Sequence, residues 1–331
     1  MVLHGPIPRF ADVSTCGFSG GHQHSPTTIN NMKDPSVDNL TMDLVRLTKR
    51  NKDGAFGTQK NRQRGLTAMA SELKDIGFVL KSAKSLKPKH VDALVSHWRD
   101  KGLSNATIRN RMSWLRWWAT KVDKLPVLHK SNGAYELLEE KQSNASKASA
   151  LTAGQLEKLT DRHVKAAVLL QAAFGLRREE AMKFMPSEAI KSDCIKLKGS
   201  WTKGGRPRTI PITSYHQRTI LGAVQQIAGL SSLIPEGRTY AQHLRLYERQ
   251  TQKAGIYRPH SLRHQYAQMR YEKLTGMNCP VNGGPSRMMM EDAQYELDRQ
   301  ARARIANELG HSRIEICDLY LGCLLNERAA A

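Results

Sequence analysis

The spacing of apolar residues predicts a run of amphipathic helices in the first half of the chain. The two clearest stripes recur every three or four positions and comprise Val91, Leu94, Val95 and Trp98, and Ile108, Met112, Leu115 and Ala119. This period places side chains on one face of an α-helix. Ser104 stands just before the second stripe, where a hydroxyl can cap a helix N-terminus. With two earlier helices expected over about 39–51 and 58–76, residues 39–130 form a predicted four-helix domain.

Two polar stretches flank this domain. Residues 1–38 are rich in Gly, Ser, Pro, Asn and Thr without sustained periodicity, so we expect a flexible N-terminal arm. Residues 131–150 contain the polar run EEKQSNASKASA, a composition typical of an interdomain linker. A second domain is therefore expected over 151–331.

The pattern beyond the linker predicts a mainly α-helical domain with a small antiparallel β-sheet. A capping-box pattern at Thr152 opens its first helix. The mostly apolar stretch 162–174 is followed by a glycine, which indicates a buried helix and its end. Residues 194–213 alternate as strand, turn and strand. The Gly- and Pro-rich stretch 275–286 predicts a loop.

Charge narrows the class of partner. The chain of 331 residues has 51 Lys+Arg against 30 Asp+Glu, a formal net charge of +21, which favours a polyanionic partner. Nucleic acid is favoured over a membrane because no polybasic segment adjoins an apolar anchor. The longest nearly apolar stretch, Ala166 to Leu176, is far shorter than the ~20 residues of a spanning helix. No signal-peptide core is visible near the N-terminus, so we expect a cytoplasmic protein.

Neither a disulfide framework nor a metal site is expected. The five cysteines form no C-x-x-C pair and stand at positions 16, 194, 279, 317 and 323, which favours reduced packing residues. His22 and His24 lie among Gly, Ser and Pro without a nearby Cys or carboxylate, so a mobile loop is favoured over a metal site.

The first domain carries much of the positive charge. Residues 41–130 contain 20 Lys+Arg and 7 Asp+Glu. The candidate DNA-binding residues, all on one predicted helix, are Arg109, Arg111, Arg116 and Lys121. The alternative is that these charges only solvate helix faces, which is the usual role of any single Lys or Arg.

Four segments of the second domain carry the chemistry when taken together. They are GLRREEAMKF (175–184), WTKGGRPRTIPI (201–212), PHSLRHQYA (259–267) and ELGHSRIEICDLYLG (308–322). In this order they resemble the catalytic domain of the tyrosine recombinases, the integrase family of phages and integrative elements. The resemblance covers most of 149–322. The first domain also resembles the family's helical, SAM-like core-binding domain, notably in GLSNATIRNRMSWLRWWA.

One departure from the family concerns the spacing of its motifs. Arg263 and His311 are 48 residues apart, about twice the family's usual gap. The resemblance is therefore closest to mobile-element integrases with an extended stretch here, and the excess falls in an insertion at about 275–292. DNA contact, protomer contact and regulation all remain open as its role.

The resemblance implies two arginines that bind the scissile phosphate, Arg177 and Arg263. A guanidinium meets the non-bridging oxygens with paired hydrogen bonds and stays protonated at any working pH. Arg178, the next residue, is the alternative to Arg177. The Gly-Leu-Arg order of residues 175–177 and the presence of Glu180 three residues after Arg177 favour Arg177. Glu180 is expected to orient that arginine, although an ordinary surface glutamate is an equal alternative.

The resemblance also implies the groups that move protons. Tyr320, nine residues after His311, is the expected nucleophile, and His260 is the general base that takes its proton. Lys203 is the general acid for the departing 5′ oxygen, and His311 donates a hydrogen bond to the phosphate. His264 is interpreted as structural. No metal, ATP or other cofactor is implied, because arginines supply the positive charge that metal ions supply in two-metal nucleases.

The expected function is that of a site-specific recombinase or integrase, which cleaves and rejoins DNA through a 3′-phosphotyrosyl intermediate to integrate or excise a mobile element. Its expected partners are double-stranded DNA attachment sites, three further copies in a homo-tetramer on DNA, and an accessory excision or bending protein. We expect a bacterial, nucleoid-associated location. The alternatives are a non-catalytic basic DNA-binding protein that keeps the fold, and a type IB topoisomerase-like activity.

Overall fold

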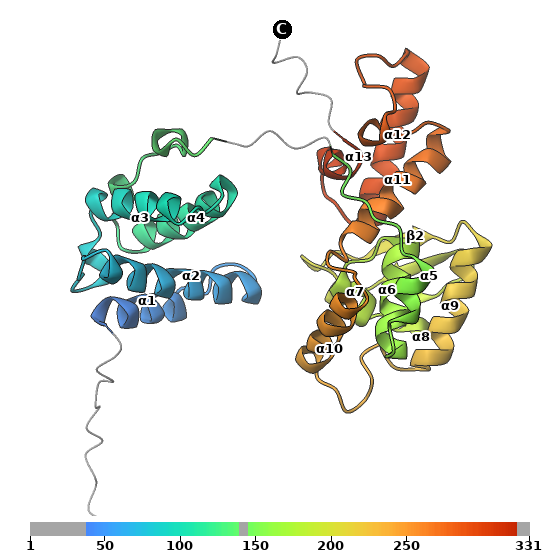
Figure 1. Ribbon diagram of the computed structural model, residues 1–331, viewed down its shortest axis with the longest axis horizontal. Helices are drawn as coiled ribbons and strands as arrows, with labels where there is room; N and C mark the ends of the chain where they lie inside the picture. The colour runs from blue at the N-terminus through green and yellow to red at the C-terminus, as the bar shows by residue number, and fades with distance from the viewer. Residues whose placement is uncertain (1–37, 139–144, 323–331) are drawn as a thin grey trace, which may run out of the picture. The chain divides into compact units, whose positions relative to one another are not determined.

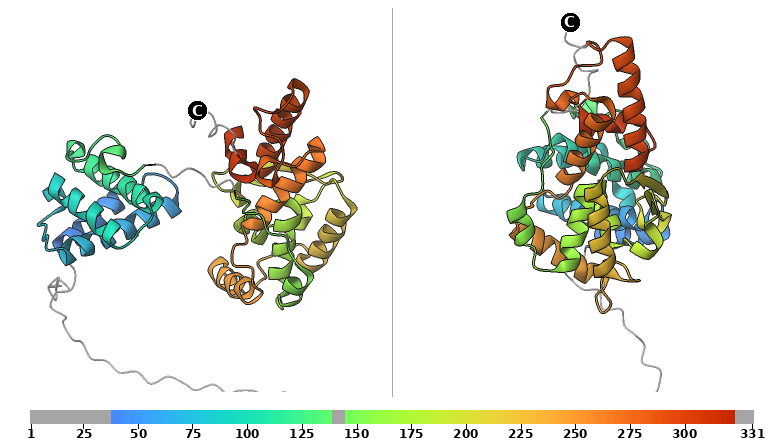
Figure 2. Two further views of the ribbon diagram at one scale, coloured as in Figure 1. Left: turned by 45° about the horizontal axis from the view of Figure 1, so that its top comes forward. Right: turned by 90° about the vertical axis from the view of Figure 1, so that its right-hand side faces the viewer.

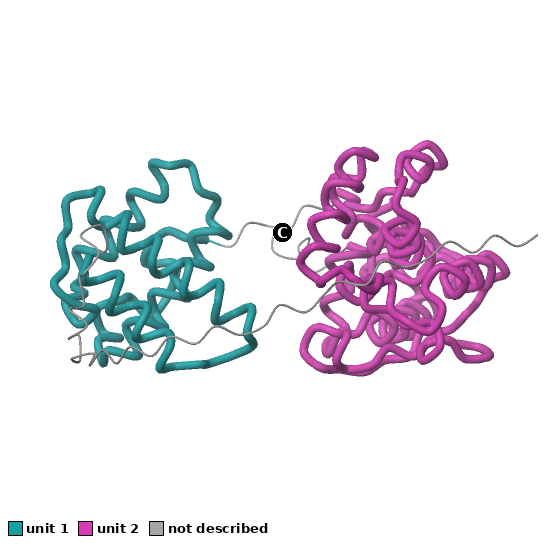
Figure 3. Tube along the Cα trace, turned by 90° about the horizontal axis from the view of Figure 1, so that it is seen from below, with its two compact units in different colours: residues 1–140 teal, residues 141–331 magenta. Residues whose placement is uncertain are grey.

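The computed structural model describes residues 38–138 and 145–322. The chain divides into two compact units, residues 1–140 and 141–331 (Figure 3). This boundary falls inside the stretch 131–150 that we predicted as a linker, although Tyr135 and Leu137 within that stretch are buried in the core of unit 1. The predicted N-terminal arm lies outside the described residues, apart from Asp38.

Unit 1 contains the four predicted helices. They are α1 (Asn39–Arg50), α2 (Phe56–Asp75), α3 (Pro88–Asp100) and α4 (Asn105–Lys121), with short 3-10 helices at Ala83–Ser85, Leu125–Val127 and Gly133–Tyr135. Side-chain caps begin two of them, because Asp38 accepts a hydrogen bond from the Thr41 amide and Ser104 accepts one from the Thr107 amide. Such caps satisfy amides that have no partner within the helix.

Two tryptophans fill the centre of unit 1. Trp98 on α3 and Trp118 on α4 are completely buried. Each indole N–H has an acceptor, since Trp98 donates to Glu72 at 2.8 Å and Trp118 donates to the Ala83 carbonyl at 3.0 Å. The large apolar rings are therefore buried without leaving a polar hydrogen unpaired.

A glycine inside α2 permits the close approach of a third tryptophan. A Cβ atom at Gly65 would lie 2.2 Å from Cε3 and 2.3 Å from Cζ3 of Trp114. Alanine is the better helix former by about 1 kcal/mol, but overpacking against a rigid ring costs about 1–3 kcal/mol. We therefore expect Gly65→Ala to lower the free energy of unfolding, as measured by urea denaturation.

The matched control for this prediction is Gly57→Ala, near the start of the same helix. A Cβ at Gly57 meets no atom within 4 Å, so this variant should be as stable as the wild type or more stable. If both glycine variants stabilised the protein, the contact between α2 and the Trp114 ring would not limit packing.

Unit 2 is mainly helical with one two-stranded sheet (Figures 1 and 2), as predicted. Its helices are α5 (Ala153–Glu157), α6 (Arg162–Phe174), α7 (Arg178–Met182), α8 (Pro186–Ala189), α9 (Tyr215–Ala228), α10 (Tyr240–Lys253), α11 (Ser261–Thr275), α12 (Asp292–Leu309) and α13 (Asp318–Leu321). The short 3-10 helices are Gly199–Trp201, Pro280–Asn282 and Ile314–Cys317.

The sheet is the predicted hairpin. Strands β1 (Cys194–Leu197) and β2 (Arg208–Pro211) pair antiparallel, with Leu197 opposite Arg208. Ile195 of β1 and Ile210 of β2, which lie opposite each other in the sheet, are fully buried. Gly204 and Gly205, predicted at the turn, adopt φ angles of 83° and 70° in the connecting loop, a backbone region that glycine reaches without strain.

Helix α6 lies in the core of unit 2 and packs against α7, α9, α10 and α11. It ends at Gly175, whose φ is 61° and whose Cβ, if present, would lie 2.6 Å from the Tyr266 ring. Both the left-handed backbone and the close ring require glycine at this position. The turn leads directly into Arg177, which precedes α7.

Helix α11 packs against α6, α12 and α13. Helices α11, α12 and α13 lie together in Figures 1 and 2. Residues 276–291 connect α11 to α12 and contain the 3-10 helix at Pro280–Asn282. They make up most of the insertion predicted at about 275–292. Among residues 38–138 and 145–322, no helix combines the length and apolar character needed to span a membrane.

Candidate active site

Five of the six predicted catalytic residues lie in one cluster of unit 2. Each stands at or near the end of a helix: Arg177 before α7, His260 at the N-cap of α11, Arg263 in the first turn of α11, His311 after α12, and Tyr320 in α13. The cluster joins segments that are far apart in the sequence. Its geometry is therefore a property of the fold and not of any one motif.

The Tyr320 hydroxyl lies between two predicted catalytic side chains. Arg263 Nε donates to it at 3.3 Å, and the hydroxyl lies 3.5 Å from His260 Nε2. Because a guanidinium nitrogen can only donate, the hydroxyl accepts from Arg263. A His260 imidazole with its own proton on Nδ1 can then accept the phenolic proton at Nε2. This arrangement suits proton transfer from the phenol to the imidazole.

Arg263 is the buried anchor of the cluster. It has no exposed surface, and it donates to the Gly175 carbonyl at 2.5 Å and to the Leu309 carbonyl. Burial lowers the pKa of its guanidinium to about 10, so it remains protonated at neutral pH. Arg263 therefore holds the ends of α6 and α12 together while it keeps a positive charge beside Tyr320.

The two histidines of the cluster are neutral near pH 7. Partial burial, together with the charges of Arg263 and Arg177, lowers the pKa of His260, which leaves its imidazole free to accept a proton. The same causes lower the pKa of His311 to about 3. Arg263 Nη2 lies 3.2 Å from His311 Nε2, and since the arginine donates, the His311 proton resides on Nδ1. His311 could then donate to a phosphate only through Nδ1.

A third histidine packs on the nucleophile candidate. The His264 ring lies 4.5 Å from the Tyr320 ring between centroids, and His264 is buried. Burial is the largest cause that lowers its pKa, to about 4. Its position agrees with the structural role interpreted from the sequence, since it supports the ring of Tyr320 and not its hydroxyl.

Glu180 holds Arg177 and a second arginine that the sequence analysis missed. Its carboxylate accepts from Arg177 Nη1 at 2.9 Å and from Arg208 Nη2 at 2.6 Å, and its side chain is 1% exposed. Burial alone would raise the pKa of Glu180, but hydrogen bonds and charges of Arg208 and Arg177 lower it to about 2. Glu180 is therefore a buried carboxylate that orients Arg177, and the surface alternative is wrong.

Arg208 connects the hairpin to the cluster. It stands at the start of β2, and its Nε donates to the Glu308 carbonyl at 2.8 Å. A period-two signal was available in the sequence, because a strand places Arg208 and the apolar Ile210 on the same face. An arginine that faces inward on a strand requires a buried acceptor, and Glu180 supplies it.

Lys203 lies apart from these contacts. It stands in the exposed loop of the hairpin, and it forms no hydrogen bond or ion pair with the residues that the structure describes. The structure therefore does not bring Lys203 into the cluster. Its predicted role as general acid stays a prediction.

The four candidate DNA-binding residues lie on different sides of α4. Arg109 and Arg116 are seven residues apart and share a side. Arg111 binds Glu72 at 2.8 Å and its guanidinium lies 5.2 Å from the Trp98 ring, so its charge is already paired. Lys121 forms an ion pair with Asp53 at 2.9 Å. Arg116 donates to the His129 carbonyl at 3.5 Å, and contact of these four residues with phosphate stays a prediction.

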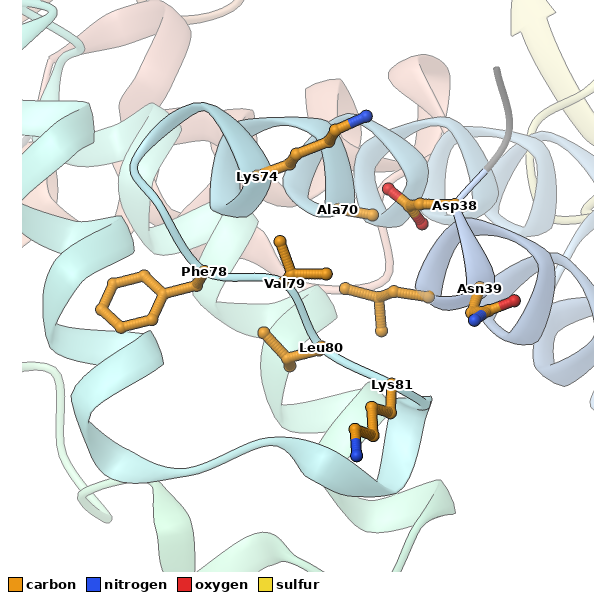
Figure 4. A pocket seen from close by; sticks show the side chains of 9 residues that line it. Asp38, Asn39, Ala70, Lys74, Phe78, Val79, Leu80 and Lys81 are labelled. Atoms are coloured by element: carbon orange, nitrogen blue, oxygen red, sulfur yellow. The ribbon is translucent and has the colours of Figure 1, made fainter. Parts of the chain in front are cut away.

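The described residues outside the cluster include a pocket but no candidate metal site. In the described ranges, no group of three His, Cys, Asp or Glu side chains is placed to hold a metal ion. A hollow in unit 1 lies between the start of α1 and the segment after α2 (Figure 4). Ala70, Lys74, Val79 and Leu80 line it, and it contains none of the predicted catalytic residues. We assign it no function.

Comparisons with known proteins agree on one family. A family model described as "Phage integrase, N-terminal" matches residues 37–125, and one described as "Integrase" matches residues 140–269. A search of curated proteins found no match.

Solved structures share the fold of the chain at low sequence identity. XerH site-specific recombinase bound to palindromic difH substrate aligns with a TM-score of 0.54 and 17% identity over 88% of this chain and 84% of that one. The Tn1549 transposon integrase in complex with circular intermediate DNA gives 0.53 and 13% over 89% and 99%. A lambda integrase tetramer bound to a Holliday junction gives 0.50 and 19% over 77% and 79%.

Proposed function

This chain belongs to the tyrosine recombinase family, and from that premise we propose that it is a site-specific DNA recombinase that cleaves and rejoins DNA through a 3′-phosphotyrosyl intermediate. The observation that carries the proposal is the position of the Tyr320 hydroxyl. Arg263 on one side and His260 on the other, 57 and 60 residues earlier in the chain, contact this one oxygen. A phenol surrounded by a cation and a neutral imidazole is prepared to become a nucleophile.

In the proposed reaction the Tyr320 oxygen attacks the scissile phosphorus while His260 accepts the phenolic proton. The hydrogen bond from Arg263 stabilises the negative charge that develops on the attacking oxygen. Lys203 protonates the 5′ oxygen as the bond from phosphorus to that oxygen breaks, and a phosphotyrosyl ester replaces this bond. Since one phosphoester is exchanged for another, rejoining requires no ATP, and His260 returns the proton.

The accessible side of the cluster is suited to an anion. Arg177 is 23% exposed and His260 is exposed, whereas Arg263 is fully buried. A phosphate that enters the site therefore meets Arg177 and His260 first. Glu180 and Arg208 fix the Arg177 guanidinium, so little reorganisation is needed when charge builds on the non-bridging oxygens. Positive side chains supply the charge stabilisation, and no metal is invoked.

The proposed substrate is double-stranded DNA at attachment sites. The net charge of +21 favours a polyanion. The XerH and Tn1549 integrase structures hold DNA, and the lambda integrase structure is a tetramer on a Holliday junction. By this likeness we propose that four copies act together to integrate or excise a mobile element, with an accessory DNA-bending protein, at the bacterial nucleoid in the cytoplasm.

The direct test is to trap the covalent adduct. The protein is incubated with a pool of duplexes of randomised sequence that carry a nick, so that the short 5′ fragment diffuses away after cleavage and rejoining is blocked. We expect DNA–protein adducts that resist denaturation, with Tyr320 in the linked peptide by mass spectrometry. Linkage to Tyr266, Tyr271 or Tyr295 would refute the assigned nucleophile, and no adduct from any duplex would refute the proposed activity.

Lys203→Ala should lower cleavage of ordinary DNA by ~10² or more, because a general acid typically contributes ~10² to 10⁴ to the rate. A 5′-phosphorothiolate substrate releases a thiolate, which leaves without a proton. It should therefore restore cleavage by Lys203→Ala but not by Arg177→Ala, as measured by single-turnover adduct formation. Equal defects on both substrates would leave Lys203 as a DNA contact alone.

The salt dependence of DNA affinity tests the predicted phosphate contacts of Arg109 and Arg116 on α4. Each phosphate contact contributes about −0.9 to the slope of log affinity against log salt. Replacing Arg109 and Arg116 together by alanine should make that slope shallower by up to ~1.8. Arg111→Gln, whose charge pairs with Glu72, should leave the slope unchanged. Fluorescence anisotropy at several salt concentrations measures both.

Two results would count against this surface. An unchanged slope for the double variant, with the helical fold intact by circular dichroism, would place the DNA surface of unit 1 elsewhere. A preference for one competing sequence over another that changes with these residues would indicate base recognition, because phosphate contacts weaken all sequences in parallel.

A further inference from the structure

The insertion between α11 and α12 contacts the helix that carries Tyr320. We propose that residues 279–287, the brace segment, position the nucleophile, and that Asn282 and Arg287 are its positioning residues. The inference rests on the proposed function, since it assigns a role in the same reaction. The extended stretch between Arg263 and His311 would then serve to position Tyr320.

The first connection runs from the brace segment to the backbone of Tyr320. Asn282 Nδ2 donates to Gln268 Oε1 at 3.0 Å, and Gln268 Nε2 donates to the Tyr320 carbonyl at 3.0 Å. Gln268 is buried on α11. Asn282, together with Ser146, whose hydroxyl lies 3.0 Å from Gln268 Nε2, orients the Gln268 amide. This amide in turn presents its nitrogen to the nucleophile's own main chain.

The second connection reaches the start of α13 through buried charges. Arg287 Nε donates to Asp298 Oδ2 at 2.9 Å. Asp298 also binds Arg302 at 2.8 Å, and both of those side chains are fully buried. Arg302 Nη1 then donates to Asp318 at 2.8 Å. Asp318 is two residues before Tyr320, so the second connection meets the short helix at its first residue and the first connection meets it at the nucleophile itself.

The brace segment also packs against the residue that follows α13. Gly322 follows α13, and a Cβ there would lie 2.9 Å from the Val281 amide nitrogen and 3.3 Å from Pro280. Cys279 beside them is buried. A helix of four residues, Asp318–Leu321, is far below the length at which an isolated helix is stable. Its position therefore depends on what it packs against, and the brace segment is one of its contacts.

The chemistry of the insertion does not favour DNA contact, which is one of the other open roles. Arg287 is already paired with Asp298, so its charge is not free for a phosphate. The exposed side chains that follow it, Met288 and Met289, are apolar and cannot neutralise DNA. Positioning matters for the rate because a misplacement of about 1 Å can cost ~10² in an oriented reaction.

The test compares an Asn282→Ala, Arg287→Gln double variant with Met289→Ala, an exposed control two residues away. Cleavage of a nicked duplex is measured in single turnover at saturating DNA. We expect unchanged DNA affinity and up to ~50-fold slower adduct formation for the double variant, from a neutral and a charged hydrogen bond lost independently. The control should match the wild type. Thermal melting verifies that each variant is folded.

A second readout separates positioning of the nucleophile from damage to the phosphate site. In a Tyr320→Phe background, hydrogen peroxide serves as an external nucleophile: its hydroperoxide anion attacks phosphorus, and the 5′ oxygen leaves with a proton. This reaction uses the arginines and histidines but not the Tyr320 hydroxyl. The double substitution should leave the peroxide-dependent cleavage rate unchanged while it slows cleavage by the tyrosine.

Several outcomes would overturn the inference. Adduct formation by the double variant within about twofold of the wild type would exclude positioning, since even one neutral hydrogen bond is worth more than that on average. An equal loss of peroxide-dependent cleavage would mean that the phosphate site is damaged instead. If the double variant fails to fold, Asn282→Ala alone decides, because Asn282 is exposed. Absence of adduct from the wild type would instead refute the proposed function.

Discussion

Replacing Tyr320 by phenylalanine should abolish the covalent DNA adduct and leave DNA affinity unchanged. The substitution removes the oxygen that would attack phosphorus, so the phosphotyrosyl bond cannot form. The ring is kept, so its packing on His264 at 4.5 Å is preserved. Arg263 retains its bonds to the carbonyls of Gly175 and Leu309. Tyr320 is 5% exposed, so it contributes little surface for DNA to contact.

The matched control is Tyr295→Phe on α12. Tyr295 is 44% exposed and outside the cluster, and its loss should not alter adduct formation. Electrophoresis under denaturing conditions measures the adduct, and anisotropy measures binding. An adduct that persists in Tyr320→Phe would show that another residue attacks, whereas loss of both binding and adduct would show that the hydroxyl matters for the fold.

Local sequence was sufficient where a structure is determined by neighbouring residues. The apolar run 162–174 with a glycine after it predicted α6 at its observed bounds. The alternation over 194–213 predicted the hairpin, and the Ser104 cap is present in the structure. In each case the pattern of apolar residues and a glycine or capping serine lie within a few positions of each other. These local signals predict the element without knowledge of its tertiary contacts.

Local sequence was insufficient where a charge finds its partner through the fold. Arg111 looked like a DNA-facing cation, but its partner Glu72 is 39 residues away on α2. Arg208 was missed for the same reason, because Glu180 is 28 residues before it. A sequence shows that an arginine is present, whereas only the packed structure shows which carboxylate it meets. The spacing of motifs likewise gave no indication that Lys203 forms no hydrogen bond or ion pair with the described residues.

The carboxylate of Glu180 explains how Arg177 and Arg208 can lie close together in unit 2. Arg177 and Arg208 converge on one carboxylate whose pKa is about 2, so the charge of Glu180 persists throughout the working pH range. Two buried or half-buried cations would otherwise repel each other. The carboxylate keeps them together, and it leaves Arg177 with hydrogen-bond donors for an incoming anion, because a guanidinium has five.

Arg177→Ala should lower the rate of DNA cleavage by ~10² or more, as loss of one preorganised donor to a developing negative charge does in other enzymes. Binding should weaken far less, since affinity is spread over many phosphate contacts. Arg177 is a better test than Arg263, because Arg263 is fully buried and its loss would leave the carbonyls of Gly175 and Leu309 without a donor. Glu180 keeps Arg208 as its partner in this variant.

Arg178→Ala is the matched control for this prediction, because Arg178 is the neighbouring arginine and pairs with Glu248 at the surface. Single-turnover adduct formation at saturating DNA separates the chemical step from binding. We expect near-normal cleavage from Arg178→Ala and the large defect from Arg177→Ala. The reverse result would move the phosphate-binding role to Arg178. Equal and small defects would exclude both from the site, and would mean that Glu180 and Arg208 together stabilise the fold but do not prepare a phosphate-binding arginine.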